Sequence, residues 1–108
     1  MSMIRIGSAT PWGAADSVDV IAEGITRVGT PSHGGIHLSQ ARLDSIPEWG
    51  RKGHSGFTPP EWFEEDAEVV YVWLAFPELF PIQQGAALNT ARQYYPQLLC
   101  ECGKRRGH

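Results

Sequence analysis

Cysteine and long apolar runs are both scarce in this chain. Its two cysteines, Cys100 and Cys102, form a Cys-x-Cys pair that is too short for an easy disulfide and lacks the second pair of a zinc site. A reduced, cytoplasmic protein is therefore the simplest expectation. No run of 18 apolar residues occurs and no charged-then-apolar leader opens the sequence, so we expect neither a membrane-spanning nor an exported protein.

An excess of basic residues is also missing. Nine basic residues stand against twelve acidic ones, for a net charge of -3 and a pI of about 5.7, so no global positive field would attract nucleic acid phosphates. The sequence has no Gly-x-Gly-x-x-Gly fingerprint, P-loop or Gly-x-Ser-x-Gly elbow. We therefore expect no direct nucleic acid binding and no cofactor.

What the chain does contain favours one small globular domain. Hydrophobic residues make up 42% of its 108 residues, and four Trp are among them, which is too apolar for disorder. Twelve Gly and eight Pro predict many turns and short elements rather than a helical bundle. We expect a single domain over residues 1–96 and a flexible C-terminal tail over 97–108.

The N-terminal half predicts a small antiparallel β-meander, after a short strand within residues 3–12 that runs into a Pro-Trp turn. Residues 16–38 hold three β-branched runs, broken at Glu23-Gly24 and at residues 31–35. Period-two patterning, with Val18 and Val20 in one run and with Ile36 and Leu38 around His37 in another, predicts one buried face. Within residues 30–35, Gly34 and Gly35 are expected to supply the positive φ angles of a hairpin turn.

The C-terminal half predicts helices. Ser39 suits the N-cap of a short helix ended by Pro47, and a last helix is expected from about Gln84 to Tyr95, with Ala87, Leu88, Ala91 and Tyr95 inward. Between them, Thr58-Pro59-Pro60-Glu61 predicts a helix start, and the helix is expected to reach about Phe76. Residues 69–73 are rich in β-branched and aromatic side chains, so a strand is the alternative there. The fold class is α+β: a small meander packed by two or three helices.

If residues 61–76 form one helix, four carboxylates share a face of it. Glu61, Glu64, Glu65 and Glu68 fall at i, i+3, i+4 and i+7, with Asp66 beside them. Such a face suits a partner with a basic surface. The alternative is that these acids only favour the helix N-terminus and keep the outer face solvated.

Two histidines are the main candidates for chemistry. Histidine is the side chain whose ordinary titration range lies nearest neutral pH, and we expect His33 to lie on a loop, which makes it the best candidate general base. His33 and His37 with a carboxylate from Glu64, Glu65 or Asp66 would form a two-His, one-carboxylate metal site. The alternative is that both are ordinary turn and surface residues.

Several stretches together resemble a known kind of family. They are "TPWG" (10–13), "GITRVGTPSHGGIHLS" (24–39), "WFEEDAE" (62–68), "AFPELF" (75–80) and "YYP" (94–96). This ordered set, which extends to about Pro96, is similar to a small uncharacterised domain family of bacteriophages, plasmids and other mobile elements of proteobacteria. The resemblance carries no activity. It implies that the positions to watch are Trp12, His33, Gly34, Gly35, Glu64, Glu65 and Asp66.

Such a setting implies one functional class. Short accessory proteins of mobile elements bind and block host defence machinery, and anti-CRISPR proteins are among them. Our leading expectation is therefore a non-enzymatic, cytoplasmic phage or mobile-element protein that binds a host protein complex through its acidic residues, with Trp12 and His33 as further contacts. One alternative is a small metal-dependent or His-based hydrolase. Another is a small-molecule-binding or structural module with an aromatic pocket around Trp12, Trp62 and Trp73.

Overall fold

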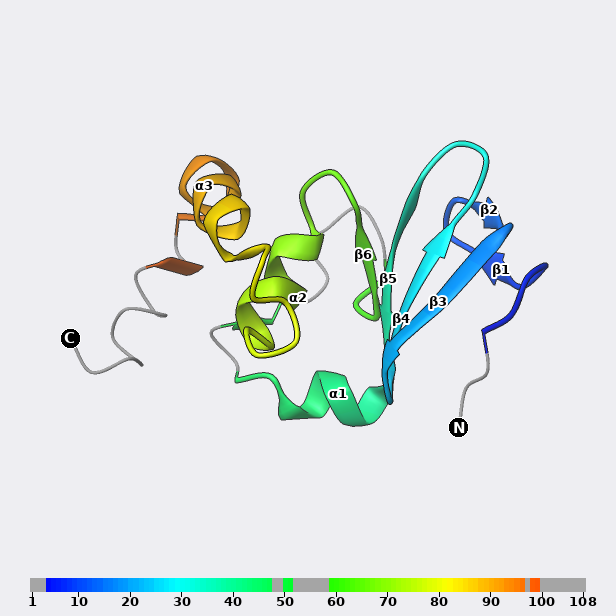
Figure 1. Cartoon of the computed structure of the whole chain (residues 1–108), viewed down its shortest axis with the longest axis horizontal. Helices are drawn as coiled ribbons and strands as arrows, with labels where there is room; N and C mark the ends of the chain where they lie inside the picture. The colour runs from blue at the N-terminus through cyan, green and yellow to red at the C-terminus, as the bar shows by residue number, and fades with distance from the viewer. Residues whose placement is uncertain (1–3, 48–49, 52–58, 97, 100–108) are drawn as a thin grey trace.

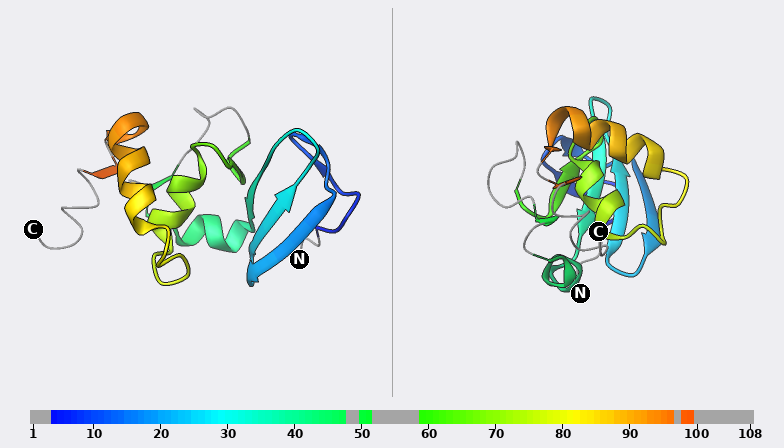
Figure 2. Two further views of the ribbon diagram at one scale, coloured as in Figure 1. Left: turned by 45° about the horizontal axis from the view of Figure 1, so that its top comes forward. Right: turned by 90° about the vertical axis from the view of Figure 1, so that its left-hand side faces the viewer.

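The structure is a computed structural model that describes residues 4–47, 50–51, 59–96 and 98–99. A four-stranded sheet stands between a two-stranded hairpin on one side and helices on the other (Figure 1). The end-on view in Figure 2 shows α2 and α3 in front of the same sheet. In chain order the elements are β1 (Ala9–Thr10), β2 (Gly13–Ala14), β3 (Ser17–Ala22), β4 (Ile25–Gly29), β5 (Gly34–Leu38), α1 (Gln40–Ser45), β6 (Trp62–Glu64), α2 (Val69–Ala75) and α3 (Gln84–Tyr94).

The predicted antiparallel meander is confirmed, as is the α+β class. Strands β3, β4 and β5 follow one another in the sheet, and β6 is added antiparallel to the outer side of β5. The β3–β4 turn falls at Glu23-Gly24 as expected, because Gly24 has a φ of 81° that other residues rarely adopt. The strand expected within residues 3–12 is reduced to β1, and the Pro-Trp turn follows it.

The two faces of the sheet have different roles. Ile36 and Phe63 are register partners and both are buried, so their shared face, the inner face, packs against α2. Side chains alternate along a strand, so Gly35, His37, Trp62 and Glu64 belong to the opposite, outer face. Each large apolar side chain removed from water contributes about 1.5–3 kcal/mol, so the inner face anchors the fold.

The helix predicted over residues 61–76 is wrong in its first half. Residues 62–64 form β6, residues 65–68 form a turn, and only Val69–Ala75 is helical. The aromatic pair Trp62-Phe63 gains a partner strand in β5, and this long-range pairing outweighs the local helix signals. The alternative of a strand over residues 69–73 is also wrong, since α2 is buried on most of its surface and its packing decides its conformation.

The turn predicted at Gly34-Gly35 is wrong as well. Both glycines are buried β5 residues, and neither has a positive φ. They are needed because neighbours approach closely: a Cβ on Gly35 would lie 2.5 Å from Cη2 of Trp12 and would also meet the backbone carbonyl of Phe63. The chain reverses one step earlier, over Thr30 to His33.

The remaining helix predictions are largely confirmed. Ser39 is the N-cap of α1 and accepts a hydrogen bond from the backbone N–H of Arg42, and α3 covers the predicted range to within one residue. The predicted inner positions Ala87 and Ala91 of α3 are buried, but Leu88 is 38% exposed. Period-two burial also fails on β3, an edge strand of the sheet, where Val20 is 66% exposed.

Part of the predicted C-terminal tail belongs to the described structure. Leu98 is buried in the hydrophobic core among residues from both halves of the chain. Several expectations concern residues outside the described ranges: the helix cap at Thr58, the Cys100–Cys102 pair, and the tail at residue 97 and over 100–108.

Candidate metal centre

His33 is held in a compact turn between β4 and β5. Its backbone carbonyl accepts hydrogen bonds from the N–H of Thr30 at 2.8 Å and from the Thr30 hydroxyl at 2.7 Å. Its own N–H donates to the same hydroxyl oxygen at 3.1 Å. Thr30 and Ser32 also direct their hydroxyls to the carbonyl of Trp12, both at 3.3 Å, which ties this turn to the β1–β2 hairpin. The turn therefore fixes the backbone of His33, from which the exposed imidazole extends.

A second turn, residues 65–68 between β6 and α2, faces the first. The backbone N–H of Glu64 donates to Oε1 of Glu68 at 3.1 Å, while the Glu64 carboxylate accepts from the N–H groups of Asp66 and Ala67. This reciprocal pattern works like a capping box ahead of α2. Glu68 is only 2% exposed, so the acidic turn is anchored from inside the protein.

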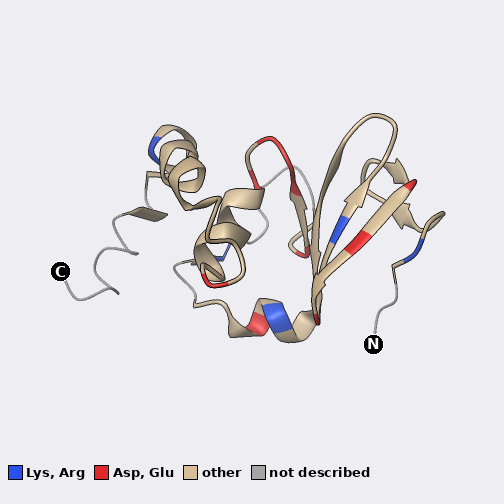
Figure 3. Ribbon diagram, viewed as in Figure 1, with Lys and Arg blue, Asp and Glu red and all other residues tan. Residues whose placement is uncertain are grey.

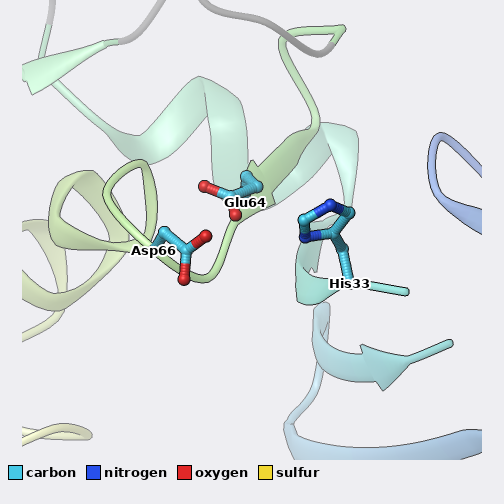
Figure 4. A group of neighbouring side chains, drawn as sticks. All are labelled: His33, Glu64 and Asp66. Carbon is cyan, nitrogen blue, oxygen red and sulfur yellow. The ribbon is translucent and has the colours of Figure 1, made fainter. Parts of the chain in front are cut away.

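The two turns bring together three groups that can ligate a metal. One ligand atom each from His33, Glu64 and Asp66 lies within 4.8 Å of the other two. Figure 4 shows the imidazole of His33 directed toward the two carboxylates, which come from the end of β6 and from the turn after it. The side chains of His33 and Asp66 are exposed and that of Glu64 is half-buried, so the cluster opens to solvent.

The electrostatics of the cluster are those of crowded carboxylates. Partial burial is the largest cause that raises the pKa of Glu64, and the neighbouring Asp66 carboxyl raises it further by sharing a hydrogen bond and by repulsion. The N–H groups of Asp66 and Ala67 act in the opposite direction, but the net shift is upward. A cation between the two carboxylates would relieve this repulsion.

The donor set selects among metals. One imidazole nitrogen and two carboxylate oxygens suit Mn²⁺, Fe²⁺ or Zn²⁺ better than Mg²⁺ or Ca²⁺, which prefer oxygen alone. A metal bound about 2.1 Å from each donor requires donors about 3 Å apart, and the exposed side chains of His33 and Asp66 can rotate to close that difference. Among the described residues the cluster offers three protein ligands, and water would fill coordination positions that the protein leaves open.

The other histidine considered for this site lies elsewhere. His37 packs on Trp62 with ring centroids 4.6 Å apart, and the described cluster does not include it. Burial lowers the pKa of His37, and the nearby carboxylate of Glu61 only partly offsets this. The predicted pairing of His33 with His37 in one metal site is therefore replaced by a one-His, two-carboxylate set.

The acidic residues do not form the predicted helix face. Glu61 precedes β6, Glu64 ends it, Glu65 and Asp66 lie in the turn, and Glu68 points into the core. Figure 3 shows Glu64 to Asp66 as part of a red segment at the β6–α2 connection. Three consecutive acids thus replace the four spaced ones because residues 62–64 form a strand rather than a helix.

The aromatic residues divide between the two sides of the sheet. Trp12 lies over Gly35 on the outer face and meets Trp62 edge-to-face at 5.7 Å. Trp73 belongs to α2, which packs on the inner side, so the expected pocket around all three tryptophans is not formed. Trp12 instead packs the hairpin onto the sheet beside the metal candidate.

Ser32 and Ser39, the serines next to the two histidines in the sequence, both hold parts of the fold together. Ser32 donates to the carbonyl of Trp12, and Ser39 caps α1. Sequence reasoning missed Thr30, whose position three residues before His33 is the signal for a side-chain-stabilised turn. It also missed the internal role of Glu68, which the spacing of four residues from Glu64 could have indicated.

Comparison with known proteins identifies the family. The chain belongs to the family described as Domain of unknown function (DUF7007), whose model matches residues 5–104. No curated protein and no solved structure matches the chain. The resemblance to an uncharacterised domain family is thus confirmed at that level. Within the described residues, none of the helices has the length and apolar character needed to cross a membrane.

Proposed function

We propose that this DUF7007 domain binds a divalent transition metal through His33, Glu64 and Asp66. The observation that supports this is that three ligands converge to within 4.8 Å of one another: His33 from the β4–β5 turn, and, about thirty residues later, Glu64 from the end of β6 and Asp66 from the turn after it. Each turn is fixed by its own hydrogen bonds, so the approach does not depend on a single flexible loop.

Metal-assisted hydrolysis is the reaction class that this geometry supports. A metal held by His33, Glu64 and Asp66 would acidify a coordinated water and so supply a nucleophile, and the open side of the cluster would give a substrate access to it. A water nucleophile also fits the roles of Ser32 and Ser39, the serines nearest the histidines in the sequence, since the hydroxyls of both bond to the backbone of the fold. This corresponds to the metal-dependent form of the hydrolase considered from the sequence.

Isothermal titration of metal-free protein with Mn²⁺ tests the proposal. Mn²⁺ avoids the thiolates of Cys100 and Cys102, which would bind Zn²⁺. We expect one Mn²⁺ per chain, with affinity reduced by about tenfold or more in His33→Gln, Glu64→Gln and Asp66→Asn. Glu65→Gln is the matched control, because it removes the same charge between the two ligands without touching the cluster. Equal affinity in all four variants would refute the site.

A second function has support from the exposed acids of the β6–α2 turn. Glu65 and Asp66 are exposed and Glu64 is half-buried, and such a patch favours fast association with a basic partner surface. In this form the protein would be a phage or mobile-element accessory protein, located in the host cytoplasm, that binds a host defence complex in the manner of an anti-CRISPR protein. The mobile-element setting itself comes from the resemblance of the sequence.

The test of this second function must avoid Glu68, whose buried side chain would make a reversal unfold the protein. We therefore propose Glu61→Lys, Glu65→Lys and Asp66→Lys together as the control in an affinity capture from host lysate. A stoichiometric partner that the triple variant fails to capture would support protein binding. Capture by both proteins, or by neither, would contradict it.

A further inference from the structure

The inner side of the molecule contains a cleft that the metal centre does not use. Its volume is about 260 Å³, and it lies between the inner face of the sheet and α2 with the segment that follows α2. Most of its lining is apolar and comes from Ile21, Ile36, Val69, Trp73 and Phe80. Ligand pockets commonly measure about 300–1,000 Å³, so this cleft suits a single ring or a branched alkyl group rather than a nucleotide.

The backbone register separates this cleft from the metal candidate. Glu65 donates its N–H to the carbonyl of Gly34, which continues the β5–β6 pairing by one residue beyond Glu64. Successive side chains therefore alternate: Glu64 and Asp66 meet His33, whereas Glu65 lines the cleft. One short acidic segment thus serves two opposite sides of the sheet.

The charges in the cleft favour a cationic ligand. Arg27 also lines it, but its guanidinium is already paired with Asp19 at 2.7 Å. Glu65 has no ion pair or side-chain hydrogen bond with the other residues that the structure describes. The third polar residue of the lining, Gln83, is neutral. Among the residues that the structure describes, the uncompensated charge of the cleft is therefore negative and belongs to Glu65.

We propose that this cleft binds a small apolar primary amine. The aromatic or branched body of the ligand contacts Trp73 and Phe80, and its ammonium group forms a charge-assisted hydrogen bond with Glu65. The ring or alkyl body of the ligand covers apolar lining residues and removes their surface from water. Its ammonium group balances the negative charge of Glu65. This site is independent of the proposed metal.

Three probes of similar size test this inference: benzylamine, benzyl alcohol and benzoate, each titrated into chelator-treated protein and followed by backbone amide shifts. We expect benzylamine to bind with a Kd of about 1 mM, as suits so small a ligand, and to shift the amides of Ile21, Ile36, Val69 and Gln83. Benzyl alcohol should bind about tenfold more weakly, because it lacks the charge that Glu65 recognises.

Two variants locate the site, and a third controls for charge. Glu65→Gln should weaken benzylamine about tenfold and leave benzyl alcohol unchanged, and Ile21→Trp should fill the cleft and abolish both. Glu61→Gln removes the same charge outside the cleft and should bind like the wild type. Equal binding of the alcohol or of benzoate would overturn the assignment to an amine. If benzylamine changes amide chemical shifts elsewhere but not those of the lining residues, the proposed site is overturned.

Discussion

Gly35 offers the sharpest test of how the sheet is assembled. An alanine there would place its Cβ 2.5 Å from Cη2 of Trp12 and even closer to the carbonyl of Phe63. The Trp12 ring can shift, but the Phe63 carbonyl belongs to the paired backbone of β6 and cannot yield without breaking the ladder. Overpacking in a well-packed site costs about 1–3 kcal/mol, and a clash with backbone belongs at the upper end.

We therefore expect Gly35→Ala to lower the free energy of unfolding by about 3 kcal/mol. For a domain of this size, that corresponds to a fall of about 10 °C or more in Tm. Urea unfolding followed by circular dichroism measures the first quantity, and a thermal scan measures the second. Gly35 is the register partner of Glu64, so the variant should also displace that carboxylate from His33 and weaken Mn²⁺ binding.

Gly85→Ala is the matched control, because it makes the same substitution where space is open. Gly85 lies in α3 with nothing within 4 Å of an added Cβ, and its φ is not positive. Alanine should stabilise the helix there, by up to about 1 kcal/mol. If Gly35→Ala costs less than about 1 kcal/mol, the close approach of Trp12 and β6 to β5 is refuted.

Two further predictions concern half-buried His37 and buried Glu68. Burial lowers the pKa of His37 in the folded state, so below about pH 6.5 the unfolded chain binds more protons than the folded protein. The free energy of unfolding should therefore fall as the pH is lowered from about 7.5 to 5.5. The variant His37→Asn should flatten that pH dependence in urea unfolding. An unchanged slope would contradict the burial of His37 against Trp62. Glu68→Ala leaves the N–H of Glu64 without its acceptor and should cost about 2 kcal/mol, whereas exposed Glu65→Ala should change stability by less than about 0.5 kcal/mol in the same assay. Similar costs for these two variants would contradict the anchoring role of Glu68.

The elements that the sequence predicted well are those whose signals are local. The β-branched runs around Gly24 predicted a meander, and Ser39 predicted a helix cap, because a positive φ and a capping hydroxyl act within a few residues. The helix predicted for the acidic segment was wrong because the structure there depends on distant residues. Residues 59–61 are of types that favour a helix start. The pairing of Trp62 and Phe63 with β5 outweighs them, and it depends on residues more than twenty positions away.

Part of the candidate site could be predicted from the sequence. His33, Glu64 and Asp66 were all among the predicted candidates, but the predicted two-His set also included His37. His37 is two residues further along β5 than Gly35, which is the register partner of Glu64, and the antiparallel register therefore places His37 opposite Trp62. Gly34 and Gly35 were misread because glycine signals both a turn and a close approach, and only the packing of Trp12 and β6 distinguishes the two.

Pulsed EPR of bound Mn²⁺ tests the central claim most directly. An imidazole nitrogen on the metal produces a characteristic ¹⁴N modulation, so the spectrum reports a ligand and not only an affinity. We predict this signal in the wild type and in His37→Gln, and its loss in His33→Gln. Mn²⁺ that binds without nitrogen modulation, or a signal that survives in His33→Gln, would contradict the metal centre at His33, Glu64 and Asp66.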